Sequence, residues 1–200
     1  RRGETMIRAV IFDVGGVLLT LGINQYLEVL ARELGSDQVA GVYRRWGERL
    51  ERGEVQEVDL WREVSGRIWP EDAFDHVFTA SFPPIPVMID FAAELRARGV
   101  QTAILSNTVP SHVRAMGFLD GFDPIAMSCA IGARKPEREA FQYVLDRLGL
   151  PPDEVAYIDD SAENVAAGRA LGLKALWHDG NVERTRRLIL GWLKARVSRS

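Results

Sequence analysis

Val10-Ile11-Phe12-Asp13-Val14-Gly15-Gly16 is the stretch of sequence that most directly indicates the fold. Its apolar start predicts a short buried strand that carries Asp13 to its carboxyl end, and the glycines predict a turn directly afterwards. In a doubly wound α/β fold, ligands bind along the edge formed by the carboxyl ends of the strands. Gly15 stands two residues after Asp13, where a second carboxylate would indicate acid–base chemistry. We therefore expect Asp13 to lie in a functional site, and we expect Gly15 to affect turnover.

Further short apolar runs alternate with helical patterns along the chain. This alternation predicts an α/β fold with a Rossmann-like parallel sheet and helices on both of its faces. The expected strands are residues 8–14, 101–105, 125–129, 155–158 and 174–177. The expected helices between and after them are residues 87–98, 136–148, 162–171 and 183–197.

One segment breaks the alternation, because far more chain separates the first two expected strands than a βαβ crossover needs. Helical patterns follow one another in this segment, at residues 26–34, 40–51, 58–68 and 71–80. The chain returns through Pro83-Pro84-Ile85-Pro86, a stiff connector. We therefore predict an α/β core of residues 7–20 and 84–200 and an inserted helical cap of residues 21–83. Because the cap emerges beside Asp13, it is well placed to act as a lid.

Composition and charge argue against several classes of protein. The chain of 200 residues has a net charge of −3 and is 46% hydrophobic, which is ordinary for a globular protein and favours neither nucleic acid nor a membrane surface as a partner. No apolar run approaches the ~18 residues of a membrane span. Cys129 is the single cysteine, and its apolar neighbours predict a small buried side chain. One cysteine forms no internal disulfide, and we expect a cytoplasmic protein.

Four groups of polar residues follow expected strands or stand just beyond them: Asp13, Ser106-Asn107, Lys135 and Asp159-Asp160. In a parallel sheet, such residues converge on one edge. Crowded carboxylates raise one another's pKa, and a hard cation such as Mg²⁺ removes that cost. The sequence therefore predicts a magnesium site at this edge.

The other residues of the set suit a phosphate ester. Lys135 supplies a positive charge for a phosphate or for an attacking carboxylate. The Ser106 hydroxyl and the backbone amides after Asp13, among them that of Gly16, are suited to hold phosphoryl oxygens. An aspartate is also able to act as a nucleophile and form an aspartyl-phosphate that water then cleaves.

The order and spacing of these motifs resemble those of the haloacid dehalogenase (HAD) superfamily. The matching segments are residues 12–18, 105–108, 134–137 and 157–164, and together they span nearly the whole chain. The inserted helices resemble the small C1-type cap of that family. The overall pattern is similar to its compact phosphatase branch, which includes sugar-phosphate phosphatases.

The resemblance implies a role for each matching residue. Asp13 would be the nucleophile and a ligand of Mg²⁺, and Gly15 would offer its backbone carbonyl to the metal. Asp160 matches the direct metal ligand of the fourth motif and Asp159 its supporting acid, so both belong to the expected metal site. Asn164, one helical turn further on, would support the metal shell.

The resemblance also implies the substrate-binding residues. Ser106 would bind the phosphoryl group, with Asn107 and Gly16 beside it. Lys135 would steady both Asp13 and the phosphate. The expected function is a Mg²⁺-dependent phosphatase of a small phosphorylated metabolite, with sugar phosphates among the candidate substrates.

The chain departs from the family's phosphatases at Gly15, where they usually carry a second aspartate that protonates the leaving group. General acid–base help contributes about 10²–10⁴ in rate, which is a small part of the acceleration that phosphate-ester hydrolysis reaches. The departure therefore predicts slow or leaving-group-sensitive turnover rather than an inactive protein.

Two other functions remain open. A haloacid dehalogenase shares the nucleophilic aspartate, but it needs no metal, and dehalogenases of the family carry Ser and Asn where this chain has Asp159-Asp160. A degenerate domain that only binds a ligand or a partner is supported by Gly15 alone. The expected oligomeric state is a monomer or a homodimer.

The expected cap is less informative. Trp46, Trp61 and Trp69 have spacings that predict packing between its helices. The turn Glu51-Arg52-Gly53-Glu54 resembles the cap loop that screens substrates in the family. His112 follows the second motif closely and is placed to lean into the site.

Overall fold

The computed structural model describes residues 6–193 and contains a parallel sheet at its centre. The strands are β1 (Ala9–Phe12), β2 (Gln101–Ser106), β3 (Ile125–Met127), β4 (Val155–Asp159) and β5 (Lys174–Trp177). They are ordered β3-β2-β1-β4-β5, and every neighbouring pair is parallel. The predicted α/β fold with a Rossmann-like sheet is confirmed.

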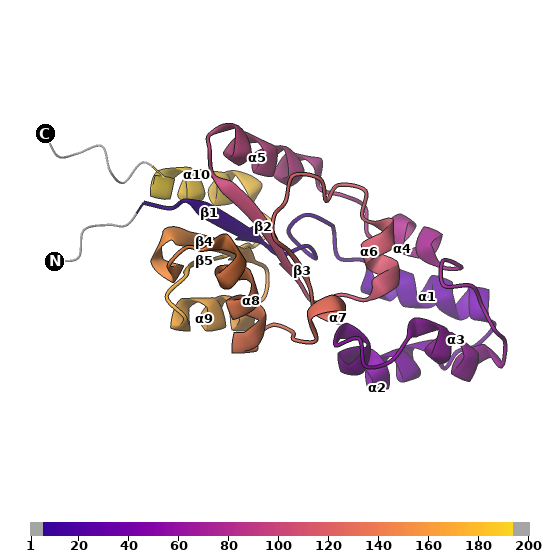
Figure 1. The fold of residues 1–200 in the computed structure, drawn as a ribbon. Helices are drawn as coiled ribbons and strands as arrows, with labels where there is room; N and C mark the ends of the chain where they lie inside the picture. The colour runs from indigo at the N-terminus through magenta and orange to yellow at the C-terminus, as the bar shows by residue number, and fades with distance from the viewer. Residues whose placement is uncertain (1–5, 194–200) are drawn as a thin grey trace, which may run out of the picture.

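Helices cover both faces of the sheet (Figure 1). On one side lie α5 (Pro86–Ala97) and α10 (Val182–Leu193), and on the other lie α8 (Arg138–Leu148) and α9 (Ala162–Ala170). Successive side chains of a strand point to opposite faces. Accordingly, Phe12 joins the apolar cluster that contains Phe91 of α5, whereas Ile11 joins the cluster that contains Phe141 of α8.

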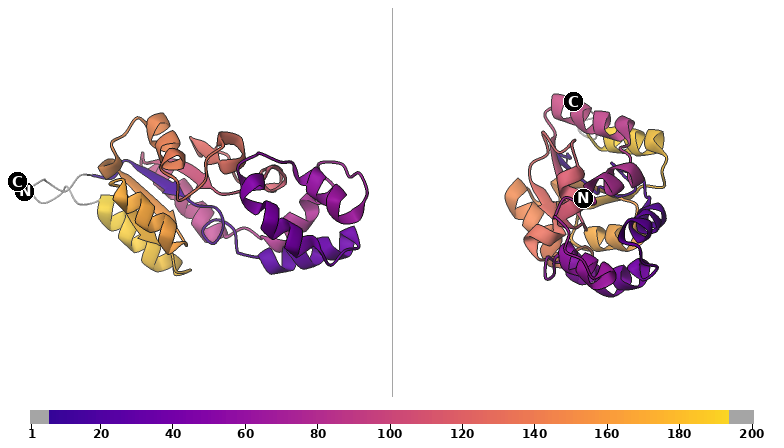
Figure 2. Two further views of the ribbon diagram at one scale, coloured as in Figure 1. Left: turned by 90° about the horizontal axis from the view of Figure 1, so that it is seen from below. Right: turned by 90° about the vertical axis from the view of Figure 1, so that its right-hand side faces the viewer.

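Four further helices form a separate group at one end of the molecule (Figures 1 and 2). They are α1 (Ile23–Leu34), α2 (Val39–Glu51), α3 (Glu57–Ser65) and α4 (Asp75–Ser81), and we call them the helical module. Trp61 and Trp69 pack on the ring of Phe74 at centroid distances of 4.7 and 5.1 Å. Trp46 packs against the apolar cluster that contains Trp61 and Phe74. The predicted packing role of the three tryptophans is confirmed.

The two segments that join the helical module to the core run side by side. The Thr20 amide donates to the Pro83 carbonyl at 3.0 Å, and the Ile85 amide donates to the Leu18 carbonyl at 2.8 Å. A Cβ on Gly22 would lie 1.7 Å from the Ser81 carbonyl oxygen. Glycine is therefore required where α1 begins beside the end of α4, and the proline-rich connector is held by hydrogen bonds as well as by its prolines.

Several element boundaries differ from the predicted ones. β3 ends at Met127 and α7 (Ser128–Ile131) follows, so the prediction of a strand through Cys129 was wrong. At this point Ser128 is bonded to the segment after β2, because its Oγ accepts from the Thr108 amide at 2.9 Å. Cys129 itself is half-buried rather than fully buried.

Other differences concern helix ends. α3 ends at Ser65, before the predicted Ile68, because Gly66 has a φ of 67° in the left-handed region and terminates the helix. α4 begins at Asp75 rather than Glu71, and α8 begins at Arg138 rather than Pro136. Two short elements were not predicted, α6 (Pro110–Ala115) and the 3₁₀ turn η1 (Pro152–Glu154). The predicted last helix matches α10 in part, and its residues 194–197 lie outside the described residues.

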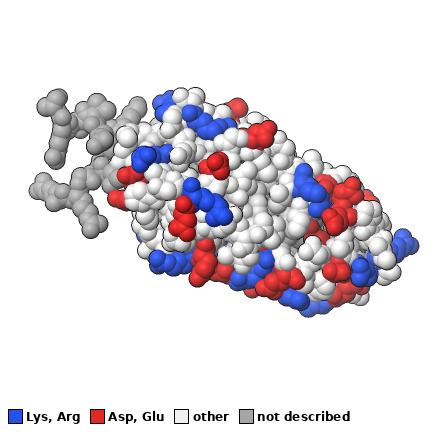
Figure 3. Space-filling model, viewed as in Figure 1, with Lys and Arg blue, Asp and Glu red and all other residues white. Residues whose placement is uncertain are grey.

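Charges of both signs alternate over the face of the molecule shown in Figure 3, and that face carries no continuous basic surface. Of the helices within residues 6–193, none combines the length and the apolar composition needed to cross a membrane.

Candidate active site

The carboxyl edge of the sheet collects the predicted residues. Phe12 pairs in register with Ile104 of β2 and Ile158 of β4, so the residues that follow these three share one edge. Asp13 follows β1, Ser106 ends β2 and Asp159 ends β4. The Asp13 amide continues the ladder by donating to the Ile158 carbonyl at 2.9 Å.

A buried cation links two of these carboxylates. Lys135 Nζ lies 2.7 Å from Asp13 Oδ1 and 2.7 Å from Asp159 Oδ2. The lysine side chain is 1% exposed. Burial alone would lower the pKa of Lys135, but the two carboxylates outweigh it and raise that pKa above its usual value. The structure thus brings Asp13, Lys135 and Asp159 into one charged cluster.

Asp159 is the best-held carboxylate of the site. Besides Lys135, it accepts hydrogen bonds from the Ser161 amide at 2.8 Å, from Asn164 Nδ2 at 3.1 Å and from the Tyr157 hydroxyl. Burial acts to raise the pKa of Asp159. The charge of Lys135 and the hydrogen bonds outweigh burial, so the pKa of Asp159 lies below its ordinary value. With both oxygens engaged in this way, Asp159 fits a supporting role better than direct metal ligation.

Tyr157, whose hydroxyl donates to Asp159, was not among the predicted site residues. Tyr157 and Asp159 are two residues apart on one strand, so their side chains point to the same face. That spacing was the signal that could have predicted the contact between Tyr157 and Asp159. In the sequence alone, Tyr157 has the context of an ordinary core tyrosine.

Asp13 and Asp160 are held less tightly. Burial raises the pKa of Asp13 to about 7, with Lys135 opposing and the Asp159 charge adding to the rise. Burial and the same neighbouring charge also raise the pKa of Asp160. Asp13 Oδ1 accepts from the Val14 amide at 2.6 Å and from Lys135, whereas no hydrogen bond from a residue in the range 6–193 reaches its Oδ2.

The three carboxylates are suited to a hard cation. One oxygen from each of Asp13, Asp159 and Asp160 lies within 4.8 Å of the other two. Lys135 supplies a single positive charge for this group. The raised pKa values of Asp13 and Asp160 show that their ionisation is costly as the site stands, and a divalent cation with oxygen ligands would remove that cost. The donor set therefore fits the predicted magnesium.

The turn after Asp13 brings Asp160 close to the backbone. Gly16 has a φ of 70°, and a Cβ there would lie 2.2 Å from Asp160 Oδ2. The Gly16 amide donates to the Leu19 carbonyl at 2.8 Å, so it is used within the turn. Phosphate binding by this amide, and metal binding by the Gly15 carbonyl, stay predictions.

Asn107 holds the loop of Lys135. Its Nδ2 donates to the Lys135 carbonyl at 2.9 Å, and its Oδ1 accepts from the Lys135 amide at 2.8 Å. Both ends of the side chain are thus engaged by the protein. These bonds give Asn107 a positioning role, and both Asn107 and Ser106 line the adjacent cavity. The predicted contact of Asn107 with substrate stays a prediction.

A cavity of about 240 Å³ adjoins this edge and extends toward the helical module. Val14, Gly15 and Ser106, which lie at the carboxyl edge of the sheet, are among its lining residues. His112 lines it as predicted, and its imidazole stacks on Phe78 at a centroid distance of 4.0 Å. Burial lowers the pKa of His112 to about 3, so the ring is neutral at physiological pH.

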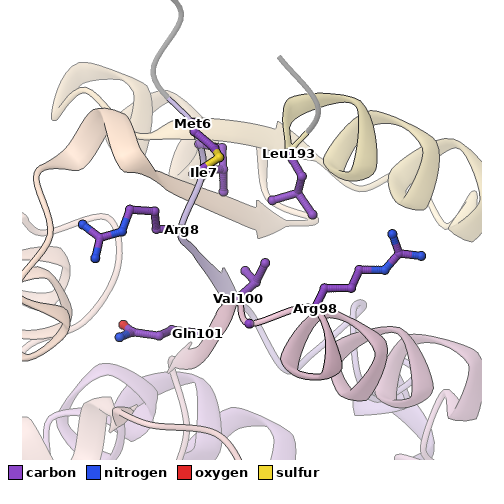
Figure 4. Close-up of a pocket in the computed structure, with 8 residues that line it drawn as sticks. Met6, Ile7, Arg8, Arg98, Val100, Gln101 and Leu193 are labelled. Atoms are coloured by element: carbon purple, nitrogen blue, oxygen red, sulfur yellow. The ribbon is translucent and has the colours of Figure 1, made fainter. Parts of the chain in front are cut away.

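A larger cavity, of about 430 Å³, lies at the opposite edge of the sheet (Figure 4). Met6, Arg8, Val100 and Leu193 are among its lining residues. None of the residues that line it is acidic, and it lies at the amino end of β1, remote from Asp13. The smaller cavity is therefore the candidate substrate site.

The helical module contacts the core on both sides of Lys135. Arg134 Nε lies 2.8 Å from Glu51 Oε2, and Arg52 Nη1 donates to Glu137 Oε2 at 3.0 Å. Gly53 has a φ of 69°, and a Cβ there would lie 2.3 Å from the Cys129 carbonyl oxygen. The predicted turn of residues 51–54 thus docks directly onto the loop that carries Lys135.

Known proteins are similar to this chain in sequence and in fold. The family description of haloacid dehalogenase-like hydrolases matches residues 7–172. The chain is 30% identical over 181 residues to the sesquiterpene phosphatase astK of Aspergillus oryzae, which covers 86% of this chain and 90% of that protein. It is 30% identical over 196 residues to acyl-CoA dehydrogenase family member 10 of Mus musculus, but it spans only 18% of that protein.

Solved structures share the architecture. An HAD family enzyme of Bacteroides thetaiotaomicron, in complex with magnesium and inorganic phosphate, matches with a TM-score of 0.75 and 23% identity. The match covers 88% of this chain and 96% of that chain. At this identity the likeness establishes the fold alone.

Proposed function

This chain belongs to the haloacid dehalogenase-like hydrolases, and on that premise we propose that it is a Mg²⁺-dependent phosphatase of a small phosphorylated compound. The observation that carries the proposal is the cluster of Asp13, Lys135, Asp159 and Asp160. Val14 and Gly15, which directly follow Asp13, line the 240 Å³ cavity. The relative named as a sesquiterpene phosphatase supports hydrolysis of a phosphate ester.

Asp13 is the proposed nucleophile. Its Oδ2 attacks the phosphorus atom, the bond from phosphorus to the ester oxygen breaks, and the departing oxygen takes a proton from water. A second water then attacks the phosphorus of the aspartyl-phosphate, which releases inorganic phosphate and restores the carboxylate. Lys135 acts in both steps by holding Asp13 Oδ1 and by favouring the ionised form of Asp13.

The other polar residues bind and position. Asp13 and Asp160 would hold the magnesium ion, with the Gly15 carbonyl as a further ligand, and Asp159 would orient Lys135. When bound, the cation neutralises charge on the phosphoryl oxygens. The Ser106 hydroxyl donates a hydrogen bond to one of those oxygens, and Asn107 keeps the Lys135 loop in place.

The test measures phosphate release from a panel of phosphate monoesters that includes an activated aryl phosphate, with Mg²⁺ and with a chelator. Removal of a nucleophile that acts as part of a unit costs on the order of 10⁴ or more in rate, so we expect Asp13→Asn to abolish release. Asp160→Asn is expected to raise the Mg²⁺ concentration that half-maximal release requires, and Asp120→Asn, at an exposed position, serves as the matched control.

Two results would contradict the proposal. Release of halide from a 2-haloacid without added Mg²⁺ would make the protein a dehalogenase. A protein that binds beryllium fluoride neither with Mg²⁺ nor without it, and that releases phosphate from none of the esters, would be a binding domain instead.

A further inference from the structure

We propose that the alcohol portion of the substrate is apolar, an alkyl or alkenyl phosphate rather than a sugar phosphate; the inference rests on the proposed function. The first observation is the lining of the 240 Å³ cavity beyond the charged cluster. Apolar side chains from the turn after β1, from α4 and from the segment around α6 contribute much of it, among them Leu19, Phe78, Phe82, Val109 and Met116, and the ring of Tyr43 from α2 adds to them.

The polar groups of the same cavity that remain for a ligand are few, namely the hydroxyls of Ser106, Thr108 and Tyr43 and the Nε2 of His112. Asn107 is engaged at both ends by the backbone of Lys135. Glu51 is held by Arg134 at 2.8 Å. His112 is stacked on Phe78, and its Nε2 is buried without a hydrogen-bond partner among the described residues. A polyol that fills this cavity would place several of its hydroxyl groups against apolar side chains, and buried hydroxyl groups left without a partner weaken binding.

The mouth of the cavity carries apolar side chains that face water. Leu21 is 65% exposed and Ile23 is 41% exposed, and both line the cavity. Leu21 Cδ2 lies 3.3 Å from the position that a Cβ on Gly15 would occupy. An apolar side chain therefore stands beside the position that lacks a carboxylate. An apolar ligand would cover Leu21 and Ile23 and remove both from water.

The size of the cavity sets the length of chain that gains from it. A volume of 240 Å³ equals that of roughly eight water molecules at about 30 Å³ each. Roughly eight non-hydrogen atoms thus fill the enclosed part, and a longer chain extends past Leu21 toward solvent. Each buried methylene is expected to strengthen binding about fourfold until that length is reached.

The experiment measures the binding of n-alkylphosphonates, from ethyl to octyl, to the protein in Mg²⁺ by calorimetry. These compounds carry the same headgroup and do not turn over, so chain length is the single variable. We expect the dissociation constant to fall about fourfold per methylene, and a polyol phosphonate of the size of the hexyl compound to bind at least tenfold more weakly than that compound. A dissociation constant independent of chain length, or tighter binding of the polyol, would overturn the inference.

A pair of identical substitutions localises the effect. Ile23→Asn places an amide at the mouth of the cavity, and Ile68→Asn places one at a site that is 84% exposed and does not line the cavity. The ratio of octyl to ethyl affinity is expected to fall severalfold in Ile23→Asn and to stay as in the wild type in Ile68→Asn. Equal ratios in the two variants would contradict the assigned cavity.

Turnover separates this inference from the proposed function. One outcome is that the aryl phosphate and the polyol phosphates release phosphate while the affinity for phosphonates does not change with chain length. The phosphatase assignment then stands, and the inference of an apolar substrate is wrong. If chain length controls affinity while no ester releases phosphate, the apolar site stands and the phosphatase assignment is wrong.

Discussion

The α/β core and the helical module bury polar groups in different ways. In the core, Lys135 lies between Asp13 and Asp159, so buried charges of opposite sign meet at 2.7 Å. In the module, buried Glu57 accepts from the amide and the hydroxyl of Ser111, and burial raises the pKa of Glu57. Among the described residues, the buried Ser81 Oγ and His112 Nε2 have no hydrogen-bond partner.

This difference separates two tasks. The core concentrates ionic charge at the sheet edge, where a cation and a phosphate would complete its neutralisation. The module, together with α6, supplies a neutral aromatic wall that excludes water. Tyr26, Phe78 and Phe82 surround the imidazole of His112 at centroid distances of 5.2, 4.0 and 5.8 Å. The following predictions disturb one side or the other, from the largest expected effect to the smallest.

Lys135→Met removes the cation from the core and leaves two buried carboxylates facing each other. Breaking a buried pair in this way costs about 3–5 kcal/mol of unfolding free energy, which urea denaturation measures. Added Mg²⁺ is expected to restore part of the loss, because a bound cation replaces the missing charge. Lys174→Met, at a half-buried lysine near Trp192, is the control and is expected to cost less. An equal loss of unfolding free energy in both variants would contradict the assigned role of Lys135 in neutralising the two buried carboxylates.

Gly15→Asp introduces a carboxylate at the boundary between the charged edge and the apolar wall. The new Cβ would meet only Leu21 Cδ2 at 3.3 Å, so a small shift of Leu21 accommodates it. We expect about 10²-fold faster release from alkyl phosphates, which have poor leaving groups, because a general acid contributes at least that much. The activated aryl phosphate needs no acid and should gain little, so a uniform gain across both substrates would argue against this explanation.

The neutral wall predicts a specific loss of stability in acid. The pKa of His112 is about 3 in the folded protein and about 6.5 when unfolded, so the unfolded chain binds the proton more tightly. The contribution of neutral His112 to the free energy of unfolding is therefore fully present above pH 6.5, and it falls as the pH drops from 6.5 toward 3. Between pH 7.5 and 5 the loss is about 2 kcal/mol.

Denaturation curves at the two pH values test this with His112→Phe, which should remove that part of the pH dependence. His76→Phe, at an exposed position of α4, is the matched control. If both variants keep the full pH dependence, His112 is not its source.

The contact between core and module is expected to be weak for each ion pair. Arg134 and Glu51 have side-chain exposures of 23% and 28%, and such pairs typically contribute about 0.5–1 kcal/mol. A double-mutant cycle with Arg134→Gln and Glu51→Gln measures this coupling, which should shrink at high salt. The same cycle on Arg45 and Glu63, an exposed pair within the module, should give a smaller value, and a larger one would contradict the docking assigned to Arg134.

The core was predictable because its signals are local. Apolar runs that end in Asp13, in Ser106 or in Asp159 are visible in a few consecutive residues, and parallel strands bring their carboxyl ends to one edge. The position of Lys135 followed from the order of the motifs. Strand and helix ends were less accurate, as at β3, where α7 begins directly at Ser128.

The partners of these residues were not predictable in the same way. Asn107 has the sequence context of a substrate-binding residue, yet both ends of its amide bond to Lys135, which is 28 residues away. Tyr157 has the context of a core aromatic residue, yet its hydroxyl holds Asp159. Each of these bonds depends on the side-chain directions of two segments at once, which no local pattern encodes.

The sequence alone determined that a parallel sheet presents carboxylates, a lysine and a serine at its carboxyl edge, because strand periodicity and strand ends are properties of short segments. Only the tertiary structure decided what faces that edge. The apolar wall is assembled from residues as far apart as Leu19 and Met116. Their convergence depends on how the helical module folds back onto the core, so the chemical character of the cavity exists only once the whole chain has packed.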